Sequence, residues 1–95
     1  MKIRVVELKA IADRLFSYLE ETDRHEFEIS EDYYWWIDQD EVYDPLRDPE
    51  KLNVGQLSDD WKELADILKG ESPAIGYALV WFSCILRRIG EMAVH

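Results

Sequence analysis

Apolar residues recur at steps of three and four near the start of the chain. They form one stripe: Val5, Leu8, Ala12, Leu15 and Leu19. This spacing matches the period of a helix that is apolar on one side. The polar run "ETDR" follows at residues 21–24. We therefore predict an amphipathic helix over residues 5–21.

From Glu26 to Ile37 the period of the pattern changes to two. The apolar positions are all odd: Phe27, Ile29, Tyr33, Trp35 and Ile37. Alternation of this kind is typical of a strand, and here it predicts either one long strand or two short strands that meet at a turn near residues 30–32. Residues 38–50, with two prolines and many acids, are predicted to form a long loop, and "KLNV" at 51–54 to add a short strand.

Two further helices are predicted in the second half of the chain. Ser58 is a candidate N-cap, Asp59 and Asp60 suit the positive end of a helix dipole, and Gly70 suits the position just after the C-terminus. The apolar stripe between them is formed by Trp61, Leu64, Ala65 and Leu68. We therefore predict a helix over residues 59–69.

Ser72 and Pro73 repeat a helix-start signal, and the helix beyond them is predicted to run to about Met92. It is apolar on nearly every side, which favours a buried, central helix. Arg87 and Arg88 are expected in its last turns, where cations complement the negative end of the dipole.

Together these elements predict an α+β fold in a single small globular domain, residues 1–95. Its order is an amphipathic N-terminal helix, a small antiparallel β-hairpin or strand pair, an acidic loop, and two helices with the C-terminal helix central. An all-helical packing with irregular strands is the alternative. With 47% hydrophobic residues, a chain of this length can form one modest core.

The net charge of −10 is concentrated in one third of the chain. Residues 20–50 carry thirteen acidic side chains and only Arg24 and Arg47 as basic ones, whereas residues 1–19 carry four basic and two acidic side chains. Such a field repels phosphate backbones and anionic lipid and attracts basic proteins. We therefore expect no nucleic-acid partner and no membrane partner.

The sequence also favours a cytoplasmic location. Its single cysteine, Cys84, cannot form an internal disulfide, and "MKIRVVELKA" lacks the sustained apolar region of a signal peptide. The most apolar stretch, residues 74–86, is shorter than the roughly 20 residues that span a bilayer.

Four consecutive aromatic residues stand inside the acidic stretch "EDYYWWIDQDE" at residues 31–41. By alternation, Tyr33 and Trp35 are expected on the core face, and Tyr34 and Trp36 on the opposite face with carboxylates. A register slip of one residue would exchange the two sets. The second face is either covered by a helix or loop, or exposed as an aromatic binding surface.

Few residues suggest chemistry. His25 is expected to be a solvated loop residue and Cys84 an inert buried thiol. Asp38 and Asp40 imitate the opening of a calcium loop, but Tyr43 and Pro49 occupy the places of its glycine and its bidentate glutamate, so an EF-hand is excluded. We expect no catalytic, cofactor-binding or metal-binding residue, and a protein that is not an enzyme.

The acid excess of residues 20–50 and the pair Tyr33–Tyr34 are loosely similar to features of bacterial immunity proteins, such as the colicin nuclease inhibitors. Those proteins are short, acidic and largely helical, with a tyrosine pair in the binding surface. Here Trp35 follows the pair in a strand-like context, where that family has proline and helices. The resemblance supplies a precedent for the mode of action, and no binding residue is transferred from it.

The leading hypothesis is a non-enzymatic acidic protein-binding module, with an immunity or antitoxin-like inhibitor as its concrete form. It would occlude a basic protein partner, with acids in place of nucleic-acid phosphates. The expected partner-binding residues are Tyr34, Trp36, Asp38, Asp40, Glu41 and Tyr43. The alternative is a structural homodimer that buries the same aromatic face and has no ligand chemistry.

Overall fold

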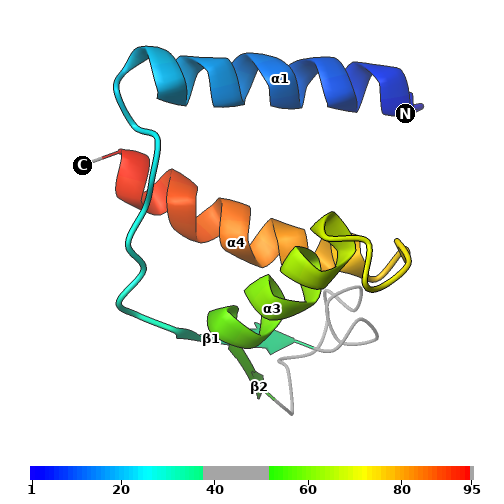
Figure 1. Ribbon diagram of the computed structural model, residues 1–95, viewed down its shortest axis with the longest axis vertical. Helices are drawn as coiled ribbons and strands as arrows, with labels where there is room; N and C mark the ends of the chain where they lie inside the picture. Colours follow the sequence, from blue (N-terminus) through cyan, green and yellow to red (C-terminus); the bar gives the residue numbers. More distant parts are fainter. Residues whose placement is uncertain (38–51, 95) are drawn as a thin grey trace.

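The computed structural model describes residues 1–37 and 52–94, and this part of the chain has an α+β fold (Figure 1). Its elements are α1 (Val5–Glu21), β1 (Tyr33–Ile37), β2 (Leu52–Gln56), α3 (Leu57–Leu68) and α4 (Ala78–Ala93). The two strands form an antiparallel sheet. The predicted fold class and order of elements are confirmed.

Helix α1 has the predicted bounds and ends in a tight turn. Asp23 adopts a left-handed conformation with φ 63°. The amide of Asp23 donates to the carbonyl of Glu20, and that of Arg24 to the carbonyl of Leu19. This pairing is a Schellman motif, which satisfies carbonyl groups that a helix end otherwise leaves without partners. The same turn sends the chain back from α1 toward α4 (Figure 1).

The sheet is shorter than the alternating pattern suggested. Only residues 33–37 of the predicted 26–37 region form a strand, so neither the single long strand nor a separate short strand before residue 30 is present; residues 24–32 pair with no strand in the described part of the chain. The predicted strand after the acidic loop is confirmed as β2. In the register, Tyr33 faces Gln56, Tyr34 faces Gly55 and Trp35 faces Val54.

The start of α3 differs from the prediction. Ser58 lies inside the helix, and the capping group is Asp32, from the segment before β1. The Asp32 carbonyl accepts the Leu57 amide at 2.7 Å, and its carboxylate accepts the Ser58 amide at 2.6 Å and the Ser58 hydroxyl at 2.7 Å. A remote side chain thus satisfies the helix amides that a local cap would take.

The end of α3 is as expected. Gly70 has φ +78°, its amide donates to the Ile67 carbonyl, and the Glu71 amide donates to the Asp66 carbonyl. This is a second Schellman motif, here with glycine at the left-handed position.

Helix α4 begins at Ala78, five residues later than predicted, and residues 73–77 precede its first turn. Gly76 lies in this stretch, and glycine is a poor helix former. At its other end α4 continues to Ala93; Arg87 and Arg88 lie within its last two turns, as expected, but neither lies in the final turn. Instead, the Arg24 side chain donates to the Ala93 carbonyl at 2.6 Å, which brings a cation to the negative end of the helix.

The core lies between α3 and α4, which pack against each other. Among the residues whose burial is described, the buried apolar ones are Leu57 and Ile85, at 2% and 5% exposure. Helix α4 lies between α1 on one side and α3 with the sheet on the other (Figure 1). Helix α4 is nevertheless not covered all round: Leu79, Val80 and Phe82 are exposed, so the prediction of a buried helix is wrong in this respect.

Candidate functional site

The aromatic run divides between the two faces of β1 in the opposite way to the prediction. Tyr33 and Trp35 were expected in the core but are 65% and 69% exposed, beside the exposed Val54 of β2. Tyr34 is half-buried and reaches α3. The alternation was correct, but the covered face is the other one, because α3 and α4 lie on the side of Tyr34.

The Tyr34 side chain packs over Gly55 of β2 and reaches Asp60 of α3. Its ring occupies the space beside Gly55 so closely that a Cβ on that glycine would overlap it. Its hydroxyl donates to the Asp60 carboxylate with an O···O distance of 2.6 Å. Asp60 is only 7% exposed, so this bond satisfies a carboxylate that has lost most of its water.

The surroundings of Tyr34 keep its hydroxyl protonated. Burial raises the pKa of Tyr34 well above its ordinary value, and the hydrogen bond to Asp60 and the neighbouring Cys84 thiol raise it further. The phenol is therefore a neutral donor at any physiological pH.

A hollow of about 470 Å³ opens beside this pair, between the sheet, α3 and α4. We call it the aromatic–acidic hollow. Its aromatic walls are Tyr33 and Tyr34 from β1 and Tyr77 and Trp81 from the start of α4; Asp59, Asp60, Val54, Gly55, Gln56, Val80 and Cys84 complete the lining. None of these described lining residues is basic.

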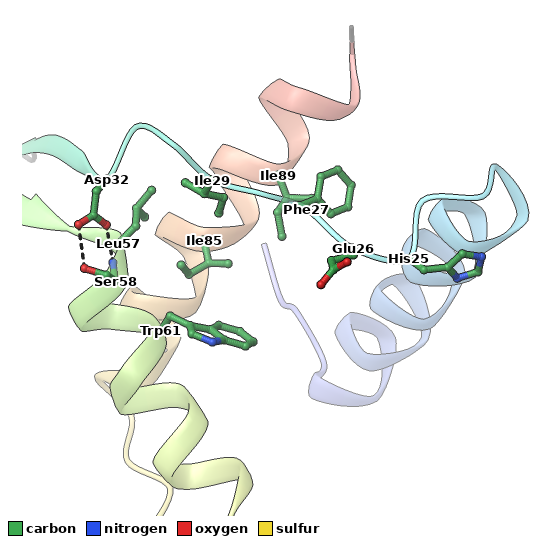
Figure 2. A pocket seen from close by; sticks show the side chains of 10 residues that line it. All are labelled: His25, Glu26, Phe27, Ile29, Asp32, Leu57, Ser58, Trp61, Ile85 and Ile89. Carbon is green, nitrogen blue, oxygen red and sulfur yellow. Dashed lines mark hydrogen bonds between the residues drawn. The ribbon is translucent and has the colours of Figure 1, made fainter.

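A second hollow, of about 530 Å³, lies on the other side of α3 and is mostly apolar. Figure 2 shows Trp61 of α3 and Ile85 and Ile89 of α4 around it, beside Phe27 and Ile29 of the segment that follows α1. The Asp32–Ser58 cap stands at one end of this hollow and His25 at the other, pointing away from the apolar side chains (Figure 2). This arrangement extends the core, and its lining also includes the carboxylates of Glu26 and of the capping Asp32.

The predicted partner-binding residues are only partly within the described structure. Tyr34 is half-buried at the Asp60 hydrogen bond, and Trp36 is a β1 residue whose backbone faces Asn53 of β2. Asp38, Asp40, Glu41 and Tyr43 lie outside the described residues. Because four of the six positions lie outside the described residues, their grouping into one surface stays a prediction.

Four residues of this region were not predicted as site residues from the sequence. Tyr33 and Trp35 were assigned to the core, and Tyr77 and Trp81 were read only as parts of an apolar helix. The ring centroids of Tyr77 and Trp81 are 5.6 Å apart with an interplanar angle of 80°, an edge-to-face contact. Their i, i+4 spacing was a visible signal for a shared helix face.

The other chemically interesting side chains give no reactive constellation. His25 is exposed, and its Nε2 lies 3.3 Å from the Asp23 carboxylate. Cys84 is partly buried rather than fully buried. Within residues 1–37 and 52–94, no three His, Cys, Asp or Glu side chains gather in a group that could hold a metal ion.

Over the same residues, no helix combines the length and the apolar character that crossing a bilayer requires. Compared with protein-family models, with curated proteins and with solved structures, the chain matches none. Fold and site geometry are therefore the basis for any functional argument.

Proposed function

We propose that this protein is a non-enzymatic binding module for a basic protein, acting in the cytoplasm. The observation that carries the proposal is the open face of the sheet, where Tyr33, Trp35 and Val54 are all more than half exposed. Tyrosine and tryptophan are the residue types most enriched at binding hot spots. An exposed group of this kind on a small domain marks a surface for another molecule.

Charge supports a basic partner. The chain has a net charge of −10, and thirteen acids fall in residues 20–50, the region that contains β1. A field of this sign speeds encounter with a basic surface and opposes contact with acidic ones. The aromatic side chains would then supply contact area, while carboxylates take the place of phosphates. An immunity or antitoxin-like inhibitor is the concrete form of this proposal.

The proposal can be tested by capture from a lysate of the source cell, with retained proteins identified by mass spectrometry. We expect the unmodified protein to retain one basic protein at low salt and to release it at high salt. Tyr33→Ala and Trp35→Ala should lose that protein while keeping a native circular-dichroism spectrum. Tyr18→Ala is the matched control, because Tyr18 is also more than half exposed but lies on α1. Equal retention by Trp35→Ala would contradict the proposal.

A structural homodimer is the second candidate, and a specific observation favours it. No residue of α1 is buried, and Leu8, Ile11 and Leu15 on its apolar side are exposed. Residues 1–19 are also net positive in an otherwise acidic chain. A second copy would offer both an apolar face and opposite charge to this helix.

Light scattering after size exclusion distinguishes the two candidates. If α1 joins two copies, Leu15→Glu should give a monomer, whereas Ser17→Glu on the same helix should leave the dimer intact. A monomeric unmodified protein would rule the homodimer out.

A further inference from the structure

We propose that the aromatic–acidic hollow receives one cationic side chain, a lysine or an arginine, from the basic partner. This inference rests on the proposed function, since it takes the partner to be a basic protein. It adds a defined pocket and a defined ligand group to the open aromatic face, which shares Tyr33 and Val54 with the hollow.

The first argument is the charge inside the hollow. Asp60 is 7% exposed, and among the described residues its carboxylate receives a hydrogen bond only from the Tyr34 hydroxyl. That donor is neutral, and no described basic residue lines the hollow to balance the carboxylate. A carboxylate with little water favours a cation close by. Asp59, one residue earlier at the rim, adds a second negative charge.

The second argument is the set of aromatic walls. Cations are attracted to the faces of tyrosine and tryptophan rings, and recognition of such groups usually needs several rings around one space. Tyr33 and Tyr34 come from the sheet, and Tyr77 and Trp81 from the start of α4. Tyr77 and Trp81 contact each other edge to face, with their rings at 80°, and both line the hollow.

The third argument concerns which ligands the hollow excludes. Its volume of about 470 Å³ lies in the usual range for a ligand pocket, roughly 300–1,000 Å³. An anion would meet Asp59 and Asp60 with no described basic residue to balance them. An apolar group would bring no opposite charge to the Asp60 carboxylate. A long cationic side chain suits both the rings and the carboxylates, because its apolar stem contacts the rings and its charged head reaches the carboxylates.

The inference is tested with blocked amino acids, so no partner is needed. N-acetyl-arginine methylamide and N-acetyl-lysine methylamide are titrated into the full protein and followed by NMR. We expect saturable shifts at the Trp81 indole and at the amides of Asp59 and Asp60, weakened by added salt. N-acetyl-norleucine methylamide has a similar stem without the charge and should give none. Equal binding of norleucine, or no saturable shift with either cation, would overturn the inference.

Variants locate the site. Asp59→Asn should weaken arginine binding about two- to fivefold, as expected for an exposed charge pair. Glu63→Gln, the same charge change one turn later on α3 and outside the hollow, should leave it unchanged. Trp81→Leu should weaken it roughly fivefold or more by removing a cation–π wall. Binding that is insensitive to both Asp59→Asn and Trp81→Leu in folded protein would also overturn the inference.

The outcomes separate this inference from the proposed function. Capture of a basic protein that depends on Trp35, without any binding of the blocked cations, would leave the proposed function in place and remove the pocket. Binding of the cations without capture of a basic protein would keep the pocket for a cationic group and remove the proposed function.

Discussion

Tyr34 and Asp60 lie 26 residues apart in sequence, and their hydrogen bond joins the sheet to α3. We predict that Tyr34→Phe lowers the free energy of unfolding by about 1–3 kcal/mol, because it leaves the buried carboxylate without its donor. Chemical denaturation measures the loss. Tyr33→Phe is the matched control: this neighbouring hydroxyl is on an exposed residue and should cost less than about 0.5 kcal/mol. Equal losses for both variants would contradict the role of the bond.

Asp32 caps α3, and the protonation of its carboxylate makes the stability of the fold depend on pH. The hydrogen bond from the Ser58 hydroxyl, with those from the Gln56 side chain and the Ser58 amide, holds the pKa of Asp32 below its ordinary value of 3.8, against a smaller opposing effect of burial. Because the folded-state pKa is the lower one, the stabilisation is present above about pH 4 and is lost as the pH falls through the folded-state pKa.

We therefore predict that Asp32→Asn is less stable than the unmodified protein at pH 7 and that the difference shrinks below pH 4. Thermal unfolding at several pH values measures it. Asp13→Asn, on the exposed part of α1, serves as the control and should show no such convergence. A difference that stays constant down to pH 2 would show that the Asp32 carboxylate is not a cap.

At the scale of the elements, the sheet depends on Gly55. A Cβ at this position would overlap the Tyr34 ring, so we predict that Gly55→Ala displaces Tyr34 and destabilises the protein by about 1–3 kcal/mol. Gly76→Ala is the control, because nothing lies within 4 Å of the Cβ it would introduce. Denaturation of both variants should therefore give a large loss for the first and little change for the second.

The turn after α1 is held by a residue in an unfavourable conformation. Asp23 has φ 63°, which costs an L-residue roughly 1–2 kcal/mol and glycine little. We predict that Asp23→Gly raises the unfolding free energy by about 0.5–1 kcal/mol, since the exposed contact with His25 that it removes is weak. Asp13→Gly, inside α1, should lower it by a similar amount. If both variants lower the unfolding free energy, the strain at Asp23 is not relieved by glycine.

At the scale of the whole molecule, one charge excess acts on both folding and binding. A net charge of −10 on 95 residues repels itself in the folded state, and salt screens this repulsion. We predict that raising sodium chloride from about 20 to about 300 mM increases the melting temperature while it weakens capture of a basic partner. Differential scanning calorimetry and the capture experiment at the same salt concentrations measure the two effects. A melting temperature that falls as salt is added would contradict the role of self-repulsion.

The fold was largely predictable because its helices depend on nearby residues. The stripe of α1 and the glycine stop of α3 are local signals, and both elements lie within two residues of the predicted bounds. The two strands were also predicted, although the length of the first was not. An alternating segment forms a strand only when a neighbouring strand pairs with it. Residues 26–32 have no such partner among the described residues.

The candidate site was predicted less well, because its geometry depends on contacts between remote segments. Aromatic residues occupy both faces of β1, so the alternation alone could not say whether Tyr33 or Tyr34 is covered. The position of α3 and α4 decides this. The same holds for the cap: Ser58 satisfied the local pattern, whereas Asp32 reaches it only because the strands bring residues 32 and 58 together.

The sequence by itself therefore determined the α+β class, the order of the elements and the acidic field, since periodicity, helix stops and net charge are properties of the chain alone. Only the tertiary structure decided that Trp35 is exposed, that Asp60 is buried against Tyr34, and that Tyr77 and Trp81 form walls of the same hollow. The physical reason is that burial and hydrogen bonding depend on which surfaces meet, and a one-dimensional pattern with apolar residues on both faces permits more than one such meeting.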